Sequence, residues 1–388
     1  MKYCVIDTET TIFQHGHPYS DRNKLCLVGI RIGDNNHVYD VEYSDSPYGG
    51  DLKDIKRILD SVDCVVGFNL KFDLGWLLRY GISLPHNTRI FDCQLAEFIL
   101  NHQSTPFPSL DSCLAKYGLG SKLHTVDEQY WSHGIDTPQV PLETLTAYLE
   151  TDLERTDELY VRLVQSKDWS RYEALGRLHM QDLRVLLEME YNGIRINWDR
   201  LEQRAKTTKE ELDVINQEIL EYVPIGFQGE FNAASNDHVS LLLYGGNLET
   251  RRAIPYDHTY KSGPKAGTTE IRNRWETVQV KFPRLVDPID GTKLAKPGYW
   301  STGADVLKQL TKPKTLLSRL LKQAELSKLL DTYLLGFPTK AQELDWKDGC
   351  IHSTLNQCVA ITGRLSSSKP NQQNIPEIFN EFITSRYS

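Results

Sequence analysis

Residues Tyr3–Thr10, with the sequence YCVIDTET, place two carboxylates two positions apart at the end of an apolar run of strand length. Residues i and i+2 of a β-strand lie on the same face. We therefore expect Asp7 and Glu9 to project together, where their charges repel unless a cation lies between them. A solvated strand end would give the same pattern, so a metal site here needs partners elsewhere in the chain.

Length and composition indicate a globular protein of two or three domains. The chain has 388 residues, of which 40% are hydrophobic, and it has no uncharged apolar run long enough to span a membrane. The first strand begins directly after Met1 without a signal peptide, so we expect a cytoplasmic location. The seven cysteines form no CxxC pair, and we expect reduced core thiols.

Charge is unevenly distributed along the chain, although the net charge is −8. Residues 1–165 carry 14 Lys/Arg and 24 Asp/Glu, whereas residues 251–330 carry 16 Lys/Arg and 7 Asp/Glu. An acidic first domain suits cation binding, and a basic middle region suits contact with phosphates. Two ordinary solvated surfaces would give the same counts.

The first 165 residues show the alternation of strands and helices that is typical of an α/β domain. After the first strand we expect two strands joined by a turn, then helices alternating with a further strand. The expected strands are 24–32, 37–41 and 63–68, and the expected helices are 52–59, 71–80, 92–100, 109–117 and 142–164.

The remainder is predicted to be mostly helical. One helix is expected to end at Asn192-Gly193, and another covers residues 198–222. Residues 245–303 are rich in Gly, Pro, Lys and Arg and show little periodicity, which indicates a mobile basic segment. Helices are expected again at 305–310 and 313–330, and a strand at 350–358.

A second acidic element follows the strand expected at 63–68. Asn69 and Asp73 are one helical turn apart. Asp73 can point back toward the carboxyl end of the strand, where pockets of α/β sheets tend to lie, and Asn69 can orient a backbone or substrate group. A helix-initiating Asn with a surface Asp is the ordinary alternative.

A third element lies in the long helix at 142–164. Tyr148 and Asp152 are again one turn apart, so a phenol and a carboxylate share a face. A metal-bound carboxylate and a nearby hydroxyl can hold a water or hydroxide between them. An exposed Asp beside a half-buried Tyr is the alternative.

In this order and at these separations, the three acidic elements resemble the three motifs of DEDDy 3'-5' exonucleases. The matching residues are Asp7, Glu9, Asn69, Asp73, Tyr148 and Asp152. The resemblance implies a ribonuclease H-like fold in which the four carboxylates hold two divalent ions, Mg2+ or Mn2+, which prefer oxygen ligands. It also implies that Tyr148 and one ion position the attacking water while the second ion steadies the departing 3' oxygen.

Aromatic residues near these motifs are candidates to stack on the terminal base, although core packing would explain any one of them. They are Phe13, Phe68, Phe72 and Trp76. Phe68 departs from the family, in which many relatives carry His, and we expect this difference to affect how the terminal base packs.

Three later segments resemble family A DNA polymerases. They are residues 188–197 (EMEYNGIRIN), residues 231–236 (FNAASN), which resemble a thumb signature, and residues 362–376 (TGRLSSSKPNQQNIP), which resemble the loop and strand before the catalytic palm motif. The last segment offers a guanidinium, hydroxyls and carboxamides that suit base edges and phosphates. The resemblance implies contact with the primer end by Arg364, Asn371, Gln373 and Asn374.

Family A enzymes have two further metal-binding palm motifs and a lysine-bearing fingers helix, and none of these fits after residue 376. We therefore expect a separate C-terminal polypeptide carrying the remaining palm and fingers, as in a split polymerase gene, unless the sequence is a shortened piece. The lack of a 5'-nuclease domain resembles bacteriophage replicative enzymes, which would act in the host cytoplasm.

Our first hypothesis is a proofreading subunit in three parts. These are an exonuclease domain at 1–168, a thumb-like helical region at 169–345 and the first palm strands at 346–388. It would bind a single-stranded 3' end and primer-template DNA. The alternatives are a ribonuclease D-like enzyme that trims RNA and a non-catalytic DNA clamp that uses the basic region 251–330.

Overall fold

The computed structural model describes residues 2–43 and 51–385. The chain divides into two compact units, which we describe separately: the first comprises Met1–Trp198 and Phe337–Ser388, and the second comprises Asp199–Gly336. This division differs from the three predicted segments, because residues 169–198 and 346–388 lie in the same unit as the first 168 residues. Their grouping depends on contacts between segments far apart in sequence, which periodicity does not reveal.

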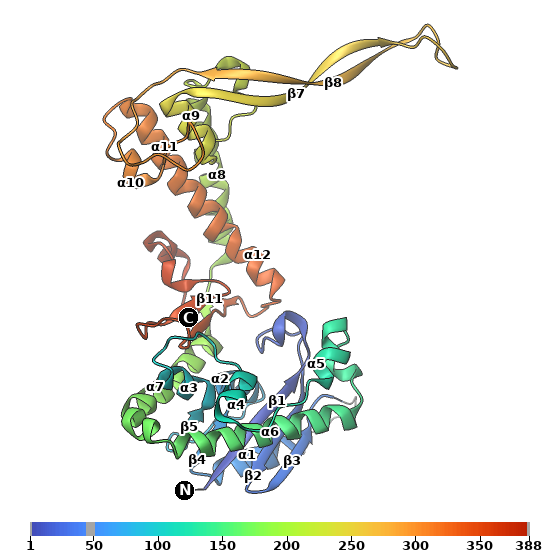
Figure 1. Cartoon of the computed structure of the whole chain (residues 1–388), viewed down its shortest axis with the longest axis vertical. Coiled ribbons are helices and arrows are strands. Elements are labelled where there is room, and N and C mark those ends of the chain that lie inside the picture. The colour runs from blue at the N-terminus through green and yellow to red at the C-terminus, as the bar shows by residue number, and fades with distance from the viewer. Residues whose placement is uncertain (1, 44–50, 386–388) are drawn as a thin grey trace. The chain divides into compact units, whose positions relative to one another are not determined.

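A five-stranded mixed sheet forms the centre of the first unit, with the order β3-β2-β1-β4-β5 (Figure 1). β1 pairs antiparallel with β2 and parallel with β4, which in turn pairs parallel with β5. The α/β class predicted from sequence is therefore present. The strands are β1 (Tyr3–Thr10), β2 (Leu25–Ile32), β3 (Asn35–Asp40), β4 (Cys64–Gly67) and β5 (Arg89–Asp92).

Buried apolar residues line both faces of the central strands, and helices cover them. α6 packs against β1 and β2, with Leu149 and Leu153 lying against Gly29 of β2, where any larger residue would clash. α7 begins at Lys167, where Ser166 caps its first turn. The helices are α1 (Asp51–Asp60), α2 (Leu70–Arg79), α3 (Cys93–Leu100), α4 (Leu110–Tyr117), α5 (Thr125–Gln129), α6 (Leu142–Val164) and α7 (Lys167–Asn192).

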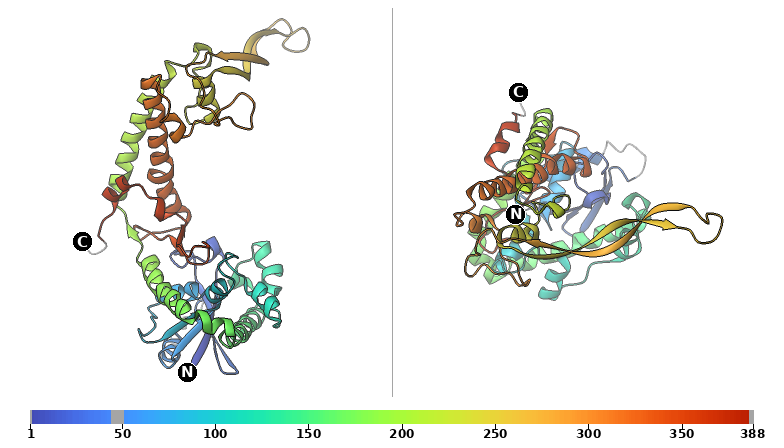
Figure 2. Two further views of the ribbon diagram at one scale, coloured as in Figure 1. Left: turned by 60° about the vertical axis from the view of Figure 1, so that its left-hand side comes forward. Right: turned by 90° about the horizontal axis from the view of Figure 1, so that it is seen from above.

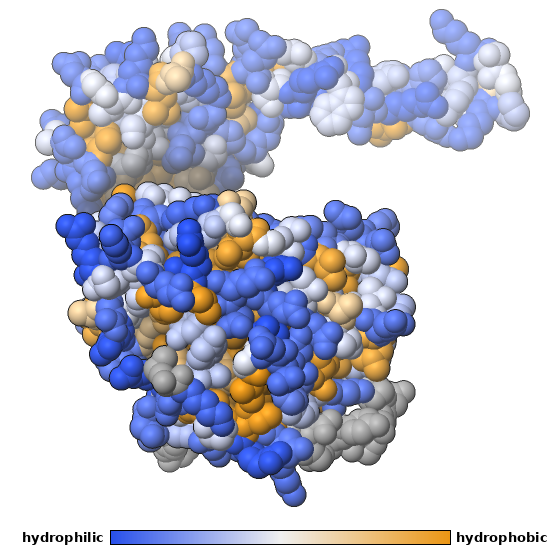
Figure 3. Space-filling model, turned by 60° about the horizontal axis from the view of Figure 1, so that its bottom comes forward, coloured by the Kyte–Doolittle hydropathy of each residue, from blue (hydrophilic) through white to orange (hydrophobic). Residues whose placement is uncertain are grey.

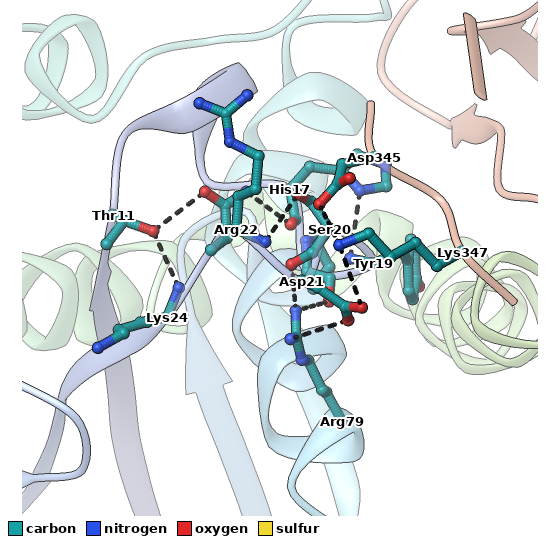
Figure 4. Close-up of polar contacts among 12 residues, drawn as sticks. Thr11, His17, Tyr19, Ser20, Asp21, Arg22, Lys24, Arg79, Asp345 and Lys347 are labelled. Atoms are coloured by element: carbon teal, nitrogen blue, oxygen red, sulfur yellow. Dashed lines mark hydrogen bonds and ion pairs between the residues drawn. The ribbon is translucent and has the colours of Figure 1, made fainter. Parts of the chain in front are cut away.

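The connection between β1 and β2 is held by polar contacts rather than by regular structure (Figure 4). The Arg79 guanidinium donates to the carbonyl oxygens of Pro18 and Ser20, each at 2.6 Å. Thr11 accepts from the Lys24 amide at 2.9 Å, which joins the two ends of the loop. Asp21 lies 3.9 Å from Lys347, so the loop also contacts the C-terminal segment of the same unit.

Within the first unit, a buried ion pair between α2 and α7 also contacts the C-terminal segment. Glu190 of α7 is 8% exposed and lies 2.5 Å from the Lys71 ammonium of α2. The same carboxylate accepts from the Leu355 amide. The strand expected at 350–358 is divided into β9 (Cys350–Ile351) and β10 (Thr354–Asn356), and β10 pairs with β11 (Ser366–Ser368).

The second unit is helical at its centre. The long helix α8 (Trp198–Leu220) and α11 (Lys314–Lys328) are joined by a bidentate pair between Glu218 and Arg319. Ser235 caps α9 (Asn236–Tyr244), and Gly245 ends it with a φ of 75°. The other helical elements are the short helix α10 (Ala304–Leu307) and a π-helix at Leu329–Leu334, which is followed by α12 (Gly336–Glu343).

The segment 245–303, which was predicted to be mobile because it shows little periodicity, contains two strands that cover nearly half of its length. β7 (Gly246–Thr259) and β8 (Thr269–Phe282) form an antiparallel ribbon that extends from the helices of the second unit (Figures 1 and 2). Both faces of most of the ribbon are open to solvent, so its strands lack the apolar alternation by which a half-buried strand is recognised.

All seven cysteines are buried and none forms a disulfide, as predicted. In the described part of the chain, no helix combines the length and the apolar character needed to cross a membrane. The cytoplasmic location stays a prediction.

Candidate exonuclease site

β1 delivers the first two carboxylates from the middle of the sheet. Glu9 is 4% exposed, and Asp7 is half-buried beside it. Thr8, on the opposite side of the strand, donates its hydroxyl to the Asp73 carboxylate at 2.7 Å. The Asp-Thr-Glu sequence thus contributes a connection to the second acidic element as well as two charges.

The second element is positioned by a carboxylate that none of the three motifs contains. Asp92, at the end of β5, accepts from the amides of Asn69 and Leu70 at 3.2 and 2.9 Å, where α2 begins. It also accepts from two amides of α3, at Gln94 and Leu95. One buried side chain therefore satisfies the first amides of two helices and fixes α2, which carries Asp73.

The third element lies on α6, where Tyr148 and Asp152 share a buried face. Lys122 donates to both, at 2.9 Å to the Tyr148 hydroxyl and 3.2 Å to the Asp152 carboxylate. Tyr148 in turn donates to Asp127 at 3.1 Å. Lys122 lies in an irregular stretch and Asp127 in the short helix α5. Their spacing to the third motif gives no sequence signal, and for that reason they were not predicted.

The pKa values indicate that the four carboxylates form one electrostatic cluster. Burial and then the charge of Asp152 raise the pKa of Asp7 to about 8. Burial and the charge of Asp7 also raise the pKa values of Glu9 and Asp73 well above their usual range. Burial raises the pKa of Asp152, although Lys122 opposes this effect. The four acidic residues, which come from three distant segments, are therefore close enough for their charges to affect one another.

The cluster fits divalent cations by its chemistry. Four carboxylates provide oxygen ligands for Mg2+ or Mn2+. The Oδ1 atom of Asp152 is buried and has no hydrogen-bond partner in the described part of the chain. A buried carboxylate oxygen without a donor is costly, and a cation would satisfy it.

The acidic cluster is more open than a closed metal site. Among the described residues, only Asp348, Cys350 and His352 bring three ligand atoms within 4.8 Å of one another. In that trio the His352 ring bonds Asp348 at 3.0 Å and the Glu190 carbonyl at 2.7 Å, so the ring already has two partners.

The four aromatic candidates for base stacking differ in burial and in their contacts. Trp76 is fully buried and donates its indole N–H to the Gly16 carbonyl at 3.0 Å, so core packing, the alternative to base stacking, explains this residue. Phe68 and Phe72 are half-buried against the core. The ring of Phe13 is covered by the Arg22 guanidinium, 3.7 Å from its centre.

The residues predicted to contact DNA lie at exposed positions of the first unit. Asn69 is exposed and adopts a left-handed conformation with a φ of 59° at the start of α2. Arg364 and Asn371 flank β11, and a short 3-10 helix, Gln372–Asn374, follows. Asn371 caps this helix and Gln373 donates to the Leu365 carbonyl at 3.0 Å, which fixes the shape of the loop. The DNA contacts of these residues stay predictions.

Comparisons with known proteins agree with the sequence resemblance. Residues 1–166 match the family model of 3'-5' exonucleases, and residues 278–386 match that of DNA polymerase family A. A solved structure described as the POL domain of Pol1 from M. smegmatis, in complex with DNA primer-template and dNTP, has a TM-score of 0.65 and 19% identity. The match covers 98% of this chain and 53% of that one, and it shows a similar fold.

Relatives along the chain are bacterial DNA polymerases I. That of Synechocystis sp. is 28% identical over 79% of this chain and 26% of its own length. Those of Bacillus subtilis and Borreliella burgdorferi are 26% and 24% identical, over 74% and 97% of this chain and 27% and 35% of their own lengths. The chain thus spans about a quarter to a third of these relatives. The chain is therefore similar to family A DNA polymerases of the DNA polymerase I type, and its first 166 residues match 3'-5' exonucleases.

Proposed function

We propose that the chain removes nucleotides from the 3' end of DNA and proofreads for a family A polymerase. The observation that supports this most is the convergence of four carboxylates beside Tyr148, with one Asp152 oxygen buried and without a partner. Asp7, Glu9, Asp73 and Asp152 would hold two divalent cations. When bound, such cations lower the pKa of a water and neutralise charge on the phosphate.

Tyr148 would orient the attacking water. Burial and the charge of Asp152 raise the pKa of its phenol, so the phenol stays protonated and does not act as a base. Its proton is donated to Asp127, and Lys122 donates to its oxygen, which leaves one lone pair to accept from a water. Tyr148 is therefore a positioning group that fixes the direction of attack.

Lys122 would support this arrangement with a positive charge. Burial works to lower its pKa, but Asp152 and Asp127 together raise it, so the ammonium stays charged. It lies against the Tyr148 hydroxyl and the Asp152 carboxylate at the same time. It thereby limits repulsion within the cluster and holds the Tyr148 oxygen in place.

Lys122→Met is expected to lower kcat for nucleotide release by about 10- to 100-fold, a size typical of residues that orient a metal site. KM for a single-stranded oligomer should change little, because Lys122 is 85% covered and faces the cluster. Lys116→Met is the matched control, since Lys116 also pairs with a buried carboxylate, Glu97, in the same domain. An unchanged kcat for Lys122→Met would exclude the positioning role.

The exposed loop that carries Arg364, Asn371, Gln373 and Asn374 would contact the primer end. Its guanidinium and carboxamides can bond minor-groove acceptors that correctly paired bases share, which gives contact without sequence preference. Asn69 would contact the terminal nucleotide at the exonuclease site. The separate polypeptide with the remaining palm and fingers, and the bacteriophage origin, stay predictions from sequence.

The proposal is tested by incubating the chain with a 3'-labelled DNA oligomer and Mg2+. We expect release of nucleoside 5'-monophosphate, which EDTA abolishes, and faster release from a mismatched 3' end than from a paired one, because mismatched ends fray more often. An RNA oligomer of the same sequence is the comparison. Preference for RNA would favour the ribonuclease D-like alternative, and no release from either substrate would refute the proposal.

A further inference from the structure

The ribbon of β7 and β8 is a long element with almost no support outside itself. Fourteen residue pairs run from Gly246 and Phe282 to Thr259 and Thr269. Arg252, near the base, bonds Glu230 and the Gly226 carbonyl of the same unit. Farther out, the hydrogen bonds and ion pairs found in the described chain join ribbon residues only to one another. Isolated two-stranded ribbons are marginally stable in water.

The outer ribbon, which we define as residues 251–277, is basic. It carries six Lys/Arg and three Asp/Glu, and it lies outside both family matches. Glu270 is already engaged by Lys265 at 2.6 Å and by Tyr260 at 2.7 Å. The remaining excess of cations, on a surface coloured mostly hydrophilic (Figure 3), complements a polyanion.

Aromatic side chains alternate with these cations. Tyr256, His258 and Tyr260 follow one another along one face, with neighbouring ring centres 6.1 and 5.0 Å apart. Arg272 lies 5.0 Å from the centre of the Tyr260 ring and donates to its hydroxyl at 2.7 Å. This face is therefore ordered by contacts within the ribbon.

The opposite face presents an open indole. Trp275 is 67% exposed, and the residue paired with it is only Ala253, so its cross-strand neighbour does not cover the ring. Arg251 pairs with Thr277, two residues from Trp275, and therefore lies on the same face. Ile271, 76% exposed, lies on the same face four residues closer to the tip. A large exposed apolar group beside a cation indicates a binding surface.

We propose that the outer ribbon binds single-stranded DNA, with Trp275 stacking on an unpaired base and Arg251 bonding a phosphate. The charge excess favours a nucleic acid over a neutral or basic protein surface. The open indole favours a single strand over a duplex, because unpaired bases expose their faces whereas duplex bases are stacked on each other. This contact lies in the second unit and is additional to the exonuclease site and the Arg364 loop.

The test is fluorescence anisotropy of a 5'-labelled oligo-dT with the full chain, in EDTA so that no nucleotide is released. Trp275→Ala is expected to weaken binding by about tenfold, a size typical of losing one stacked base. Trp275→Phe, which keeps an aromatic face, should stay within about threefold of wild type. Ile225→Ala removes another exposed apolar side chain of the same unit, 89% exposed, and should change nothing.

Arg251→Gln provides a second variant, expected to weaken binding and to lower the salt dependence of the affinity, by a slope of about 1 on a log–log plot. Wild-type affinity for oligo-dT in Trp275→Ala would overturn the proposal. So would a loss confined to a blunt duplex, since the surface would then bind paired DNA. Nucleotide release from a trinucleotide, measured on the same variants, should equal wild type and separates failure of the ribbon from failure of the exonuclease site.

Discussion

Asp7→Asn is expected to lower nucleotide release from single-stranded DNA by about a thousandfold or more, a size typical of losing a member of a catalytic group. Asp7 lies at the centre of the cluster, since its charge affects the pKa values of both Glu9 and Asp73. An amide of the same shape keeps the packing but removes an anionic ligand. The measurement is the single-turnover rate with Mg2+, at saturating enzyme.

The same substitution is expected to stabilise the protein in EDTA at alkaline pH. Folding raises the pKa of Asp7 from 3.8 to about 8. Such a group stabilises the fold fully at pH below its unfolded pKa, and the contribution is lost as pH rises to about 8. The Tm of the wild type in EDTA should therefore fall between pH 3.8 and about 8. The Tm of Asp7→Asn should fall less over the same range, so that near pH 8 the variant has the higher Tm.

Asp157→Asn is the matched control, because Asp157 is a half-buried carboxylate of α6 that bonds Tyr3 at 2.8 Å and Arg31 at 3.1 Å. Asp157 is not part of the acidic cluster. The Asp157→Asn variant should therefore release nucleotides at a rate within about twofold of wild type. If Asp7→Asn kept wild-type release, the proposed chemistry would be refuted. If it lost activity but also lost stability in EDTA at every pH, the repulsion within the cluster would be refuted instead.

Asp92→Ala is expected to lower the free energy of unfolding by about 3 kcal/mol, because it leaves amides at the start of both α2 and α3 without an acceptor. The carboxylate is 4% exposed and accepts four backbone N–H groups between 2.9 and 3.2 Å. Burial raises its pKa to about 6, so urea titration at about pH 7.5 compares the ionised form with the variant.

Ser109→Ala provides the comparison for this prediction, since Ser109 caps α4 from an exposed position through one bond of 3.1 Å. It should cost about 1 kcal/mol or less. Asp92→Asn, which keeps one acceptor oxygen, should fall between the two alanine variants. Equal costs for Asp92→Ala and Ser109→Ala would show that the shared cap is not the support of α2, and Asp73 would then be positioned by packing alone.

Local sequence determined most of the first unit. The apolar run before Asp7, the helical spacing of α6 and the polar residues that begin and end helices gave the predicted strands and helices, because these signals depend on neighbours along the chain. β5 was not predicted, since four residues at Arg89–Asp92 are too short for a recognisable period. The basic ribbon was missed because its exposed faces impose no apolar alternation.

The sequence by itself predicted the four acidic residues of the proposed site, since Asp7, Glu9, Asp73 and Asp152 match the motifs of the exonucleases that the chain resembles. Only the tertiary structure decided what surrounds them. Lys122, Asp127 and Asp92 reach the site or its supports through contacts between residues 20 or more positions apart. Such contacts depend on how separate elements pack, and this information is not contained in the periodicity of any single segment.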